Sequence, residues 1–234
     1  MFGREKIAMI VAEFVGTFTL ASVVLAMLGR TTFPFFEAIV AGLALTGLTL
    51  AFGVVSGAFF NPALAVAAWT ARKLDTTRAI VFIAAEMLGG VVAWTLNQWL
   101  LDTTLKNIAN TAFSWRIFTA EAVGAAVFAM VVAAAARQAY TGLRNAVTVG
   151  LGLTFGMLIA SFASNGLINP AVAVGVQSWS FIYVAAPVLG ALVGMNVYTY
   201  LFTDRPKRVV RVVKTAAKTA ARKTTAKKTT ARRK

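Results

Sequence analysis

The chain has 234 residues, of which 59% are hydrophobic and only 13% are charged, and its formal net charge is +15. Soluble globular domains have about 45–50% apolar and about 25% charged residues, so this composition indicates an integral membrane protein. Cysteine and histidine are absent, which excludes disulfides, thiolate chemistry and the commonest general base and metal ligand. We therefore expect neither a soluble type of enzyme nor a bound cofactor.

Six stretches, taken in chain order, are apolar and long enough to cross the hydrocarbon core, which needs about 17–25 residues. They are residues 7–28, 37–55, 79–101, 116–136, 143–163 and 181–203. Lipid offers no hydrogen-bond partner to the backbone, so spans are helices or strands of closed barrels, and the period-two alternation of barrel strands is missing. The pattern predicts an all-α membrane protein with six transmembrane helices.

Two shorter apolar stretches, residues 61–71 and 169–178, lie among the long ones. A helix of about ten residues reaches about 15 Å, half of the hydrocarbon thickness. Each stretch opens with Asn and then Pro, which are favoured at the N-cap and at the first helical position. We therefore predict two re-entrant half-helices that enter the membrane without crossing it.

The two half-helices belong to an internal repeat. The tripeptides Asn61-Pro62-Ala63 and Asn169-Pro170-Ala171 lie 108 positions apart. Further matches share this offset: Ala12, Glu13 and Gly16 with Ala120, Glu121 and Gly124, Gly42 with Gly150, Thr46 with Thr154, and Ser56 with Ser164. Each unit, at about 7–105 and 115–203, holds three spans and one half-helix, so the second unit enters from the opposite face. Such inverted repeats place a pore or binding site near the midplane, where the broken helices meet.

Two facing helix N-termini would favour neutral molecules. Each end exposes unpaired N–H groups and carries about half a positive charge. Together they would oppose a monovalent cation about 5 Å away by about 3 kcal/mol at an effective dielectric of about 20. The amides of Asn61 and Asn169 can cap the helices with their oxygens and turn their NH₂ groups into the lumen. A water that accepts from both donors points its hydrogens outward, which interrupts proton hopping.

These motifs resemble the major intrinsic protein family, the aquaporins and glycerol facilitators. The likeness covers residues 1 to about 203, and it rests on the Ser-Gly-Ala-Phe-Phe-Asn-Pro-Ala run at residues 56–63, its partner at Asn169, and the Ala-Glu pairs that contain Glu13 and Glu121. The resemblance implies six spans, two half-helices and one pore in each subunit, and a homotetramer. It also implies that both glutamates accept hydrogen bonds from the re-entrant loops, with proton relay as the alternative.

The chain departs from this family at the outer filter. The family's second motif continues with Arg, whereas the next residue here is Val172. The family's spacing implies that the other filter positions are Ala41, Met157 and Gly166. This ring carries no charge and no aromatic side chain, so it should be wide and apolar. Only the flexible Met157 side chain can occupy the volume that the small residues leave open. Such a ring either admits larger neutral solutes or dewets and closes; we favour conduction.

A third glutamate, Glu86, stands where the family commonly has Gln. Its counterpart in the second unit falls near Pro187, so it has no symmetric partner. The sequence assigns no role to it.

The basic residues of the short loops predict the orientation in the membrane. Arg4, Lys6, Arg72, Lys73, Arg78, Arg137 and Arg144 fall on one side, and Arg30, Lys106 and Arg116 on the other. The side richer in basic residues is cytoplasmic. We therefore expect a multi-pass protein of the cell membrane with both termini in the cytoplasm.

Residues 204–234 form a separate basic segment, which holds 13 of the 23 Lys and Arg and no large apolar residue after Val213. Such a composition cannot bury a core and predicts a disordered cytoplasmic tail. Anionic lipid headgroups are the first expected partner, at about 1 kcal/mol for each basic residue near the surface. Weak, salt-dependent contact with nucleic acid is the second interpretation, and gating of the pore is the third.

Taken together, these features predict a passive channel for water and small neutral solutes such as glycerol. One alternative is a secondary transporter, which shares inverted repeats and broken helices. A transporter usually needs a titratable or ion-coordinating residue at the midplane, and no Asp, His, Lys or Arg lies in the middle of a span. The other alternative is a non-conducting membrane scaffold that presents the basic tail.

Overall fold

The computed structural model describes residues 3–28, 34–109 and 112–202. The chain divides into two units, Met1–Leu201 and Phe202–Lys234. The predicted tail at residues 204–234 belongs to the second unit and lies outside the described residues.

The described residues of this unit contain helices and no strand. The helices are α1 (Arg4–Met27), α2 (Pro34–Phe52), α3 (Pro62–Thr70), α4 (Thr76–Leu100), α5 (Trp115–Arg137), α6 (Gly142–Ala160), α7 (Pro170–Gly175) and α8 (Ile182–Phe202). All except α3 and α7 are long and apolar enough to cross a membrane. This confirms the all-α class and the six predicted spans, and α3 and α7 are the two short helices.

The second short helix ends earlier than predicted, at Gly175 rather than at residue 178. The N–H of Val176 donates to the Val172 carbonyl at 2.9 Å, and Gln177 then adopts a left-handed φ of 56°. The N–H of Ser178 turns back to the Ala173 carbonyl at 2.8 Å. These bonds satisfy the last carbonyls of α7 and close the helix, as in other helix ends with a left-handed residue.

The two repeat units use equivalent helix contacts. A Cβ at Gly89 on α4 would come within 2.6 Å of the Phe14 carbonyl oxygen on α1, and a Cβ at Gly190 on α8 would meet the Ala122 carbonyl on α5. Phe14 and Ala122 are separated by the repeat offset, so α1 with α4 corresponds to α5 with α8. Both glycines let two membrane helices approach closely. Gly89 lies three positions after Glu86, and Gly190 lies three positions after Pro187. This agrees with the prediction that Pro187 is the counterpart of Glu86.

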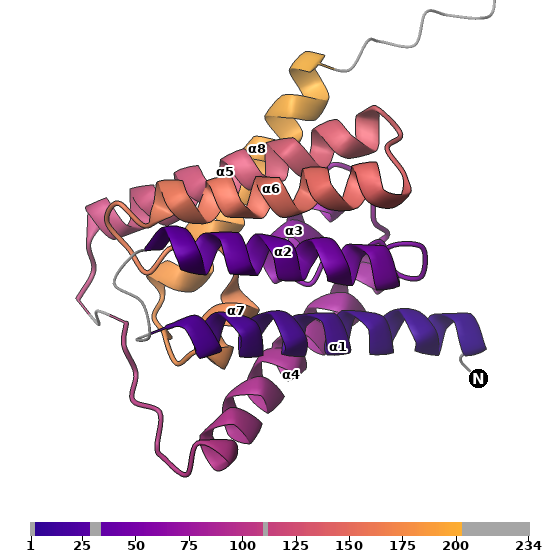
Figure 1. Ribbon diagram of the computed structural model, residues 1–234. Helices are drawn as coiled ribbons and strands as arrows, with labels where there is room; N and C mark the ends of the chain where they lie inside the picture. The colour runs from indigo at the N-terminus through magenta and orange to yellow at the C-terminus, as the bar shows by residue number, and fades with distance from the viewer. Residues whose placement is uncertain (1–2, 29–33, 110–111, 203–234) are drawn as a thin grey trace, which may run out of the picture. The chain divides into compact units, whose positions relative to one another are not determined.

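The two repeat units join where α2 lies beside α6 (Figure 1). A Cβ at Gly42 would meet Thr154 Oγ1, and a Cβ at Gly150 would meet Thr46 Oγ1. Thr154 also donates its hydroxyl to the Ala38 carbonyl at 3.1 Å. Glycine and threonine thus face each other in a two-fold arrangement, which brings the halves of the repeat together at a small-residue crossing.

The short helices lie at the core of this unit. All six residues of α7 are buried, as are six of the nine residues of α3. α3 packs against α4, α5 and α7, and α7 packs against α1 and α4. The half-helices are therefore surrounded by the long ones, which hold their N-terminal ends in place.

Candidate functional site

The short helices begin at capped asparagines. Asn61 Oδ1 accepts from the Ala63 N–H at 2.9 Å, and Asn169 Oδ1 accepts from the N–H groups of Ala171 and Val172 at 3.0 and 3.3 Å. Proline follows each asparagine at the first helical position. The N-caps predicted from the sequence are therefore present in both helices, and each cap satisfies N–H groups that have no partner inside the helix.

The same asparagines also connect the two re-entrant loops. Asn61 Nδ2 donates to the Ile168 carbonyl at 3.1 Å, and Asn169 Nδ2 donates to the Phe60 carbonyl at 2.8 Å. Asn61 is 2% exposed and Asn169 is 1% exposed. An amide NH₂ has two hydrogens, so one hydrogen of each group is used across the loops. The lumen therefore has at most one N–H from each asparagine, rather than the whole NH₂ group that the sequence analysis assigned to it.

The residue before each asparagine has a strained backbone. Phe60 has a φ of 47° and Ile168 has a φ of 44°, and both lie in the left-handed region. This conformation is unusual for a bulky or β-branched residue and costs of the order of 1–3 kcal/mol. In this conformation the Phe60 and Ile168 carbonyls accept hydrogen bonds from the asparagine side chains of the opposite loop. The strain thus belongs to the contact between the loops.

Two buried glutamates hold these strained residues. Glu13 Oε2 accepts from the Phe60 N–H and Glu121 Oε2 accepts from the Ile168 N–H, both at 2.7 Å. Their Oε1 atoms accept from the preceding N–H groups at 3.2 and 3.1 Å. Both side chains are fully buried. Glu13 and Glu121 thus each accept two backbone hydrogen bonds from a re-entrant loop.

Glu86 adds a contact to the first repeat unit that the second repeat unit does not share. Its Oε1 accepts from the Asn61 N–H at 3.1 Å, while its Oε2 is buried without a hydrogen-bond partner among the described residues. The corresponding Pro187 has no side-chain acceptor. The asymmetry is visible in the sequence, but this contact is not, because nothing local in the sequence links Glu86 to a loop 25 positions away.

Residues 3–200 match the sequence profile of the family described as Major intrinsic protein. The chain belongs to the major intrinsic protein family. Among its relatives is Aquaporin NIP3-1 of Oryza sativa subsp. japonica, 31% identical over 224 residues that cover 86% of this chain and 72% of the relative. Another is the Glycerol uptake facilitator protein-like 6 of Lactiplantibacillus plantarum, 31% identical, with 77% and 92% of the two chains covered.

A solved structure shows the same fold. The X-ray structure of the aquaglyceroporin from Plasmodium falciparum matches with a TM-score of 0.68 and covers 88% of this chain and 98% of its own. The sequence identity is 18%, so this likeness concerns the fold.

The four filter positions implied by the resemblance to the major intrinsic protein family are buried, three on helices and one in a loop. Ala41 lies on α2, Met157 on α6 and Val172 on α7, with exposed fractions of 0, 3 and 2%. Gly166 lies in the loop before α7 with a φ of 67°, and a Cβ there would come within 2.9 Å of the Met157 carbonyl oxygen. The structure therefore brings Gly166 against Met157.

An acidic side chain that the sequence analysis did not use lies on α2, one turn before Ala41. Glu37 Oε1 is buried and has no hydrogen-bond partner among the described residues. Its position in the first turn of an apolar span was the available signal.

Proposed function

We propose that the chain is a passive transmembrane channel for water and small neutral solutes such as glycerol. The observation that carries the proposal is the pairing of two half-helix N-termini, each capped by an asparagine that also bonds to the opposite loop. Membership of a family that includes aquaporins and a glycerol uptake facilitator supports the same class of function.

The paired N-termini would select against charge. The amide hydrogens that Asn61 and Asn169 do not use between the loops are free to donate to the oxygen of a passing water or alcohol. The positive ends of α3 and α7 oppose a monovalent cation by about 3 kcal/mol at about 5 Å, before its desolvation is counted. A water oriented by two donors does not continue a chain of hydrogen bonds for protons.

The filter would select weakly among neutral solutes. Ala41, Met157, Gly166 and Val172 offer neither a cation nor an aromatic ring, so the opening is shaped by small side chains and one flexible thioether. We infer that it admits solutes larger than water, and that exclusion of cations rests on the half-helix ends rather than on the filter.

Further parts of the proposal concern assembly and orientation. We infer a homotetramer with one pore in each subunit, in the cell membrane, with both termini cytoplasmic on the side that holds most basic loop residues. Residues 1–203 form the channel and residues 204–234 a basic tail that meets anionic headgroups. We assign the chain no catalytic activity and no cofactor.

Stopped-flow light scattering of proteoliposomes tests this function. The purified chain should raise the rates of osmotic water flux and of glycerol uptake above those of empty liposomes, while a pH-sensitive dye inside shows no added proton leak. Glycerol uptake that requires an ion gradient would support a transporter. An absence of any flux from folded protein would support a scaffold.

A further inference from the structure

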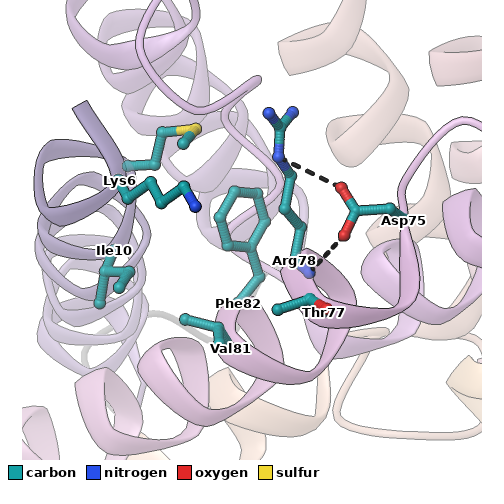
Figure 2. A pocket seen from close by; sticks show the side chains of 8 residues that line it. Lys6, Ile10, Asp75, Thr77, Arg78, Val81 and Phe82 are labelled. Carbon is teal, nitrogen blue, oxygen red and sulfur yellow. Dashed lines mark hydrogen bonds and ion pairs between the residues drawn. The ribbon is translucent and has the colours of Figure 1, made fainter. Parts of the chain in front are cut away.

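A hollow of about 300 Å³ opens between the first turns of α1 and α4 (Figure 2). It has a charged rim and an apolar floor. The lining residues are Lys6, Met9, Ile10, Asp75, Thr77, Arg78, Val81 and Phe82. None of them takes part in the contacts between the re-entrant loops described above.

The hollow lies between the starts of α1 and α4, which are both candidate membrane spans. The two helices run in parallel, so both starts lie at the same border of the membrane. Asn97 Nδ2 donates to Ser22 Oγ at 2.8 Å, and Gly89 lies against the Phe14 carbonyl. Both pairs are separated by 75 positions, so the two helices keep one register. This register places the third residues of both helices, Lys6 and Arg78, near the same end of the two spans.

The rim has an excess of positive charge. Asp75 accepts from the Arg78 N–H through Oδ1 at 3.0 Å and meets Arg78 Nε through Oδ2 at 3.3 Å. Both of its oxygens are therefore directed to Arg78. The amine of Lys6 has no hydrogen bond or ion pair with any residue in the part of the chain described here, and Figure 2 shows it pointing across the hollow toward Phe82.

The floor lies deeper in the membrane than the rim. Met9 and Ile10 follow Lys6 on α1, and Val81 and Phe82 follow Arg78 on α4, in the direction of the middle of both spans. Phe82 is 2% exposed and closes the bottom. Two cations at the membrane border above an apolar surface form an amphipathic site.

We propose that this hollow binds an anionic phospholipid, with the phosphate between Lys6 and Arg78 and one acyl chain on the floor of Met9, Ile10 and Val81. The phosphate supplies the acceptors that the Lys6 amine and the outer guanidinium nitrogens need. A soluble phosphate would use the rim and leave the apolar floor in water, whereas a phospholipid covers both. The residues that line this site include none of the pore asparagines, loop-holding glutamates or filter positions.

Lipid titration of the full chain in detergent, followed by native mass spectrometry, tests the proposal. Each basic residue near an anionic surface contributes about fivefold in affinity, so the double variant Lys6→Gln/Arg78→Gln should bind the first phosphatidylglycerol about thirtyfold more weakly. The charge-conserving variant Lys6→Arg/Arg78→Lys should bind nearly as the parent does. Phosphatidylcholine affinity should change little in either variant. The tail is present throughout, so its contribution is shared.

A matched control is Arg116→Gln, because Arg116 lines a hollow with Trp115 at the start of α5 and stands alone there as a cation. It should leave phosphatidylglycerol affinity within about twofold of the parent, because Arg116 does not line the proposed lipid site and makes only a weak, exposed contribution. Val81→Trp fills the floor and keeps both cations, so it should also weaken binding. Equal affinity of the parent and the Lys6→Gln/Arg78→Gln variant would overturn the proposal. Unchanged binding in Val81→Trp, or displacement of the lipid by inorganic phosphate, would overturn the assignment to a lipid.

Discussion

Individual residues hold the re-entrant loops through hydrogen-bond chemistry that few side chains can replace. Glu121 accepts from the N–H groups of Leu167 and Ile168 and from the Ser164 hydroxyl, at 3.1, 2.7 and 2.7 Å. All three partners are donors, and the carboxylate is an acceptor only. A buried charge is costly unless it is satisfied in this way, so the chemistry of the site requires a carboxylate.

Replacement of Glu121 by Gln should therefore destabilise the protein although the shape is kept. The amide NH₂ would face backbone N–H groups, and at least one of them would lose its acceptor inside the protein. A buried unsatisfied donor costs about 1–3 kcal/mol. We expect a lower midpoint in thermal unfolding followed by size-exclusion chromatography, and a reduced water flux for each folded molecule.

Glu5→Gln is the control for this prediction, because Glu5 is an exposed residue in the first turn of α1. It removes the same charge and should change the free energy of unfolding by less than about 0.5 kcal/mol, as surface substitutions usually do. The midpoint of thermal unfolding should therefore hardly move. If both variants unfold alike, the hydrogen bonds of Glu121 do not stabilise the loop.

A second prediction at the residue scale concerns the filter. Val172→Arg places a long cation at a filter position that the family resemblance implies, where the small Val172 side chain is 2% exposed. The guanidinium should narrow the opening, and its donors should favour water over bulkier solutes. Glycerol uptake should fall relative to water flux in the same proteoliposomes. Unchanged glycerol rates would show that Val172 does not face the narrowest part of the pore.

At the scale of the element, the short helices depend on their first residues. α7 has only six residues and α3 has nine, far fewer than the roughly 12–15 that an isolated helix needs to be even marginal in water. Their N-caps, their prolines and the surrounding long helices make up this deficit. The same asparagine fixes the helix start and the contact with the opposite loop.

Asn169→Asp separates these two tasks. The carboxylate still accepts from the Ala171 and Val172 N–H groups, so α7 should keep its cap. It cannot donate to the Phe60 carbonyl, and its negative charge offsets the half-charge of the helix end. We expect a folded channel with an increased cation leak, measured as current across planar bilayers.

Asn169→Ala provides the comparison, because it removes the cap, at a cost of about 1 kcal/mol, and adds no charge. It should therefore be less stable and leak less than Asn169→Asp. Should both variants exclude cations as the parent does, the barrier must lie elsewhere than at the half-helix ends.

The elements differ in how far the sequence predicts them. The six spans follow from apolar length, because the membrane imposes one requirement on every residue of a span. The Asn-Pro pairs likewise located both half-helix starts. The left-handed backbone of Phe60 and Ile168 had no signal, since neither is Gly or Asn. It depends on acceptors 47 positions away and amides 107 and 109 positions away, which only the fold brings together.

At the scale of the whole molecule, the charge is unevenly distributed along the chain. Residues 204–234 hold 13 basic residues and Asp204, and thus most of the net charge of +15. Within the described residues, the hydrogen bonds between the re-entrant loops and those from the loops to Glu13 and Glu121 join residues that precede this segment. Conduction and tail charge should therefore be separable.

Truncation after Thr203 tests this separation. Water flux through reconstituted protein should be unchanged, since the loops, their glutamates and the filter positions remain.

In the full chain, trypsin should cleave the tail more slowly in liposomes that contain phosphatidylglycerol than in phosphatidylcholine liposomes, because each basic residue near an anionic surface gains about 1 kcal/mol. Added salt should remove this protection, because the Debye length falls to about 3 Å at 1 M. A several-fold change in water flux on truncation would instead favour a tail that gates the pore, and protection by added DNA in phosphatidylcholine liposomes would favour contact with nucleic acid.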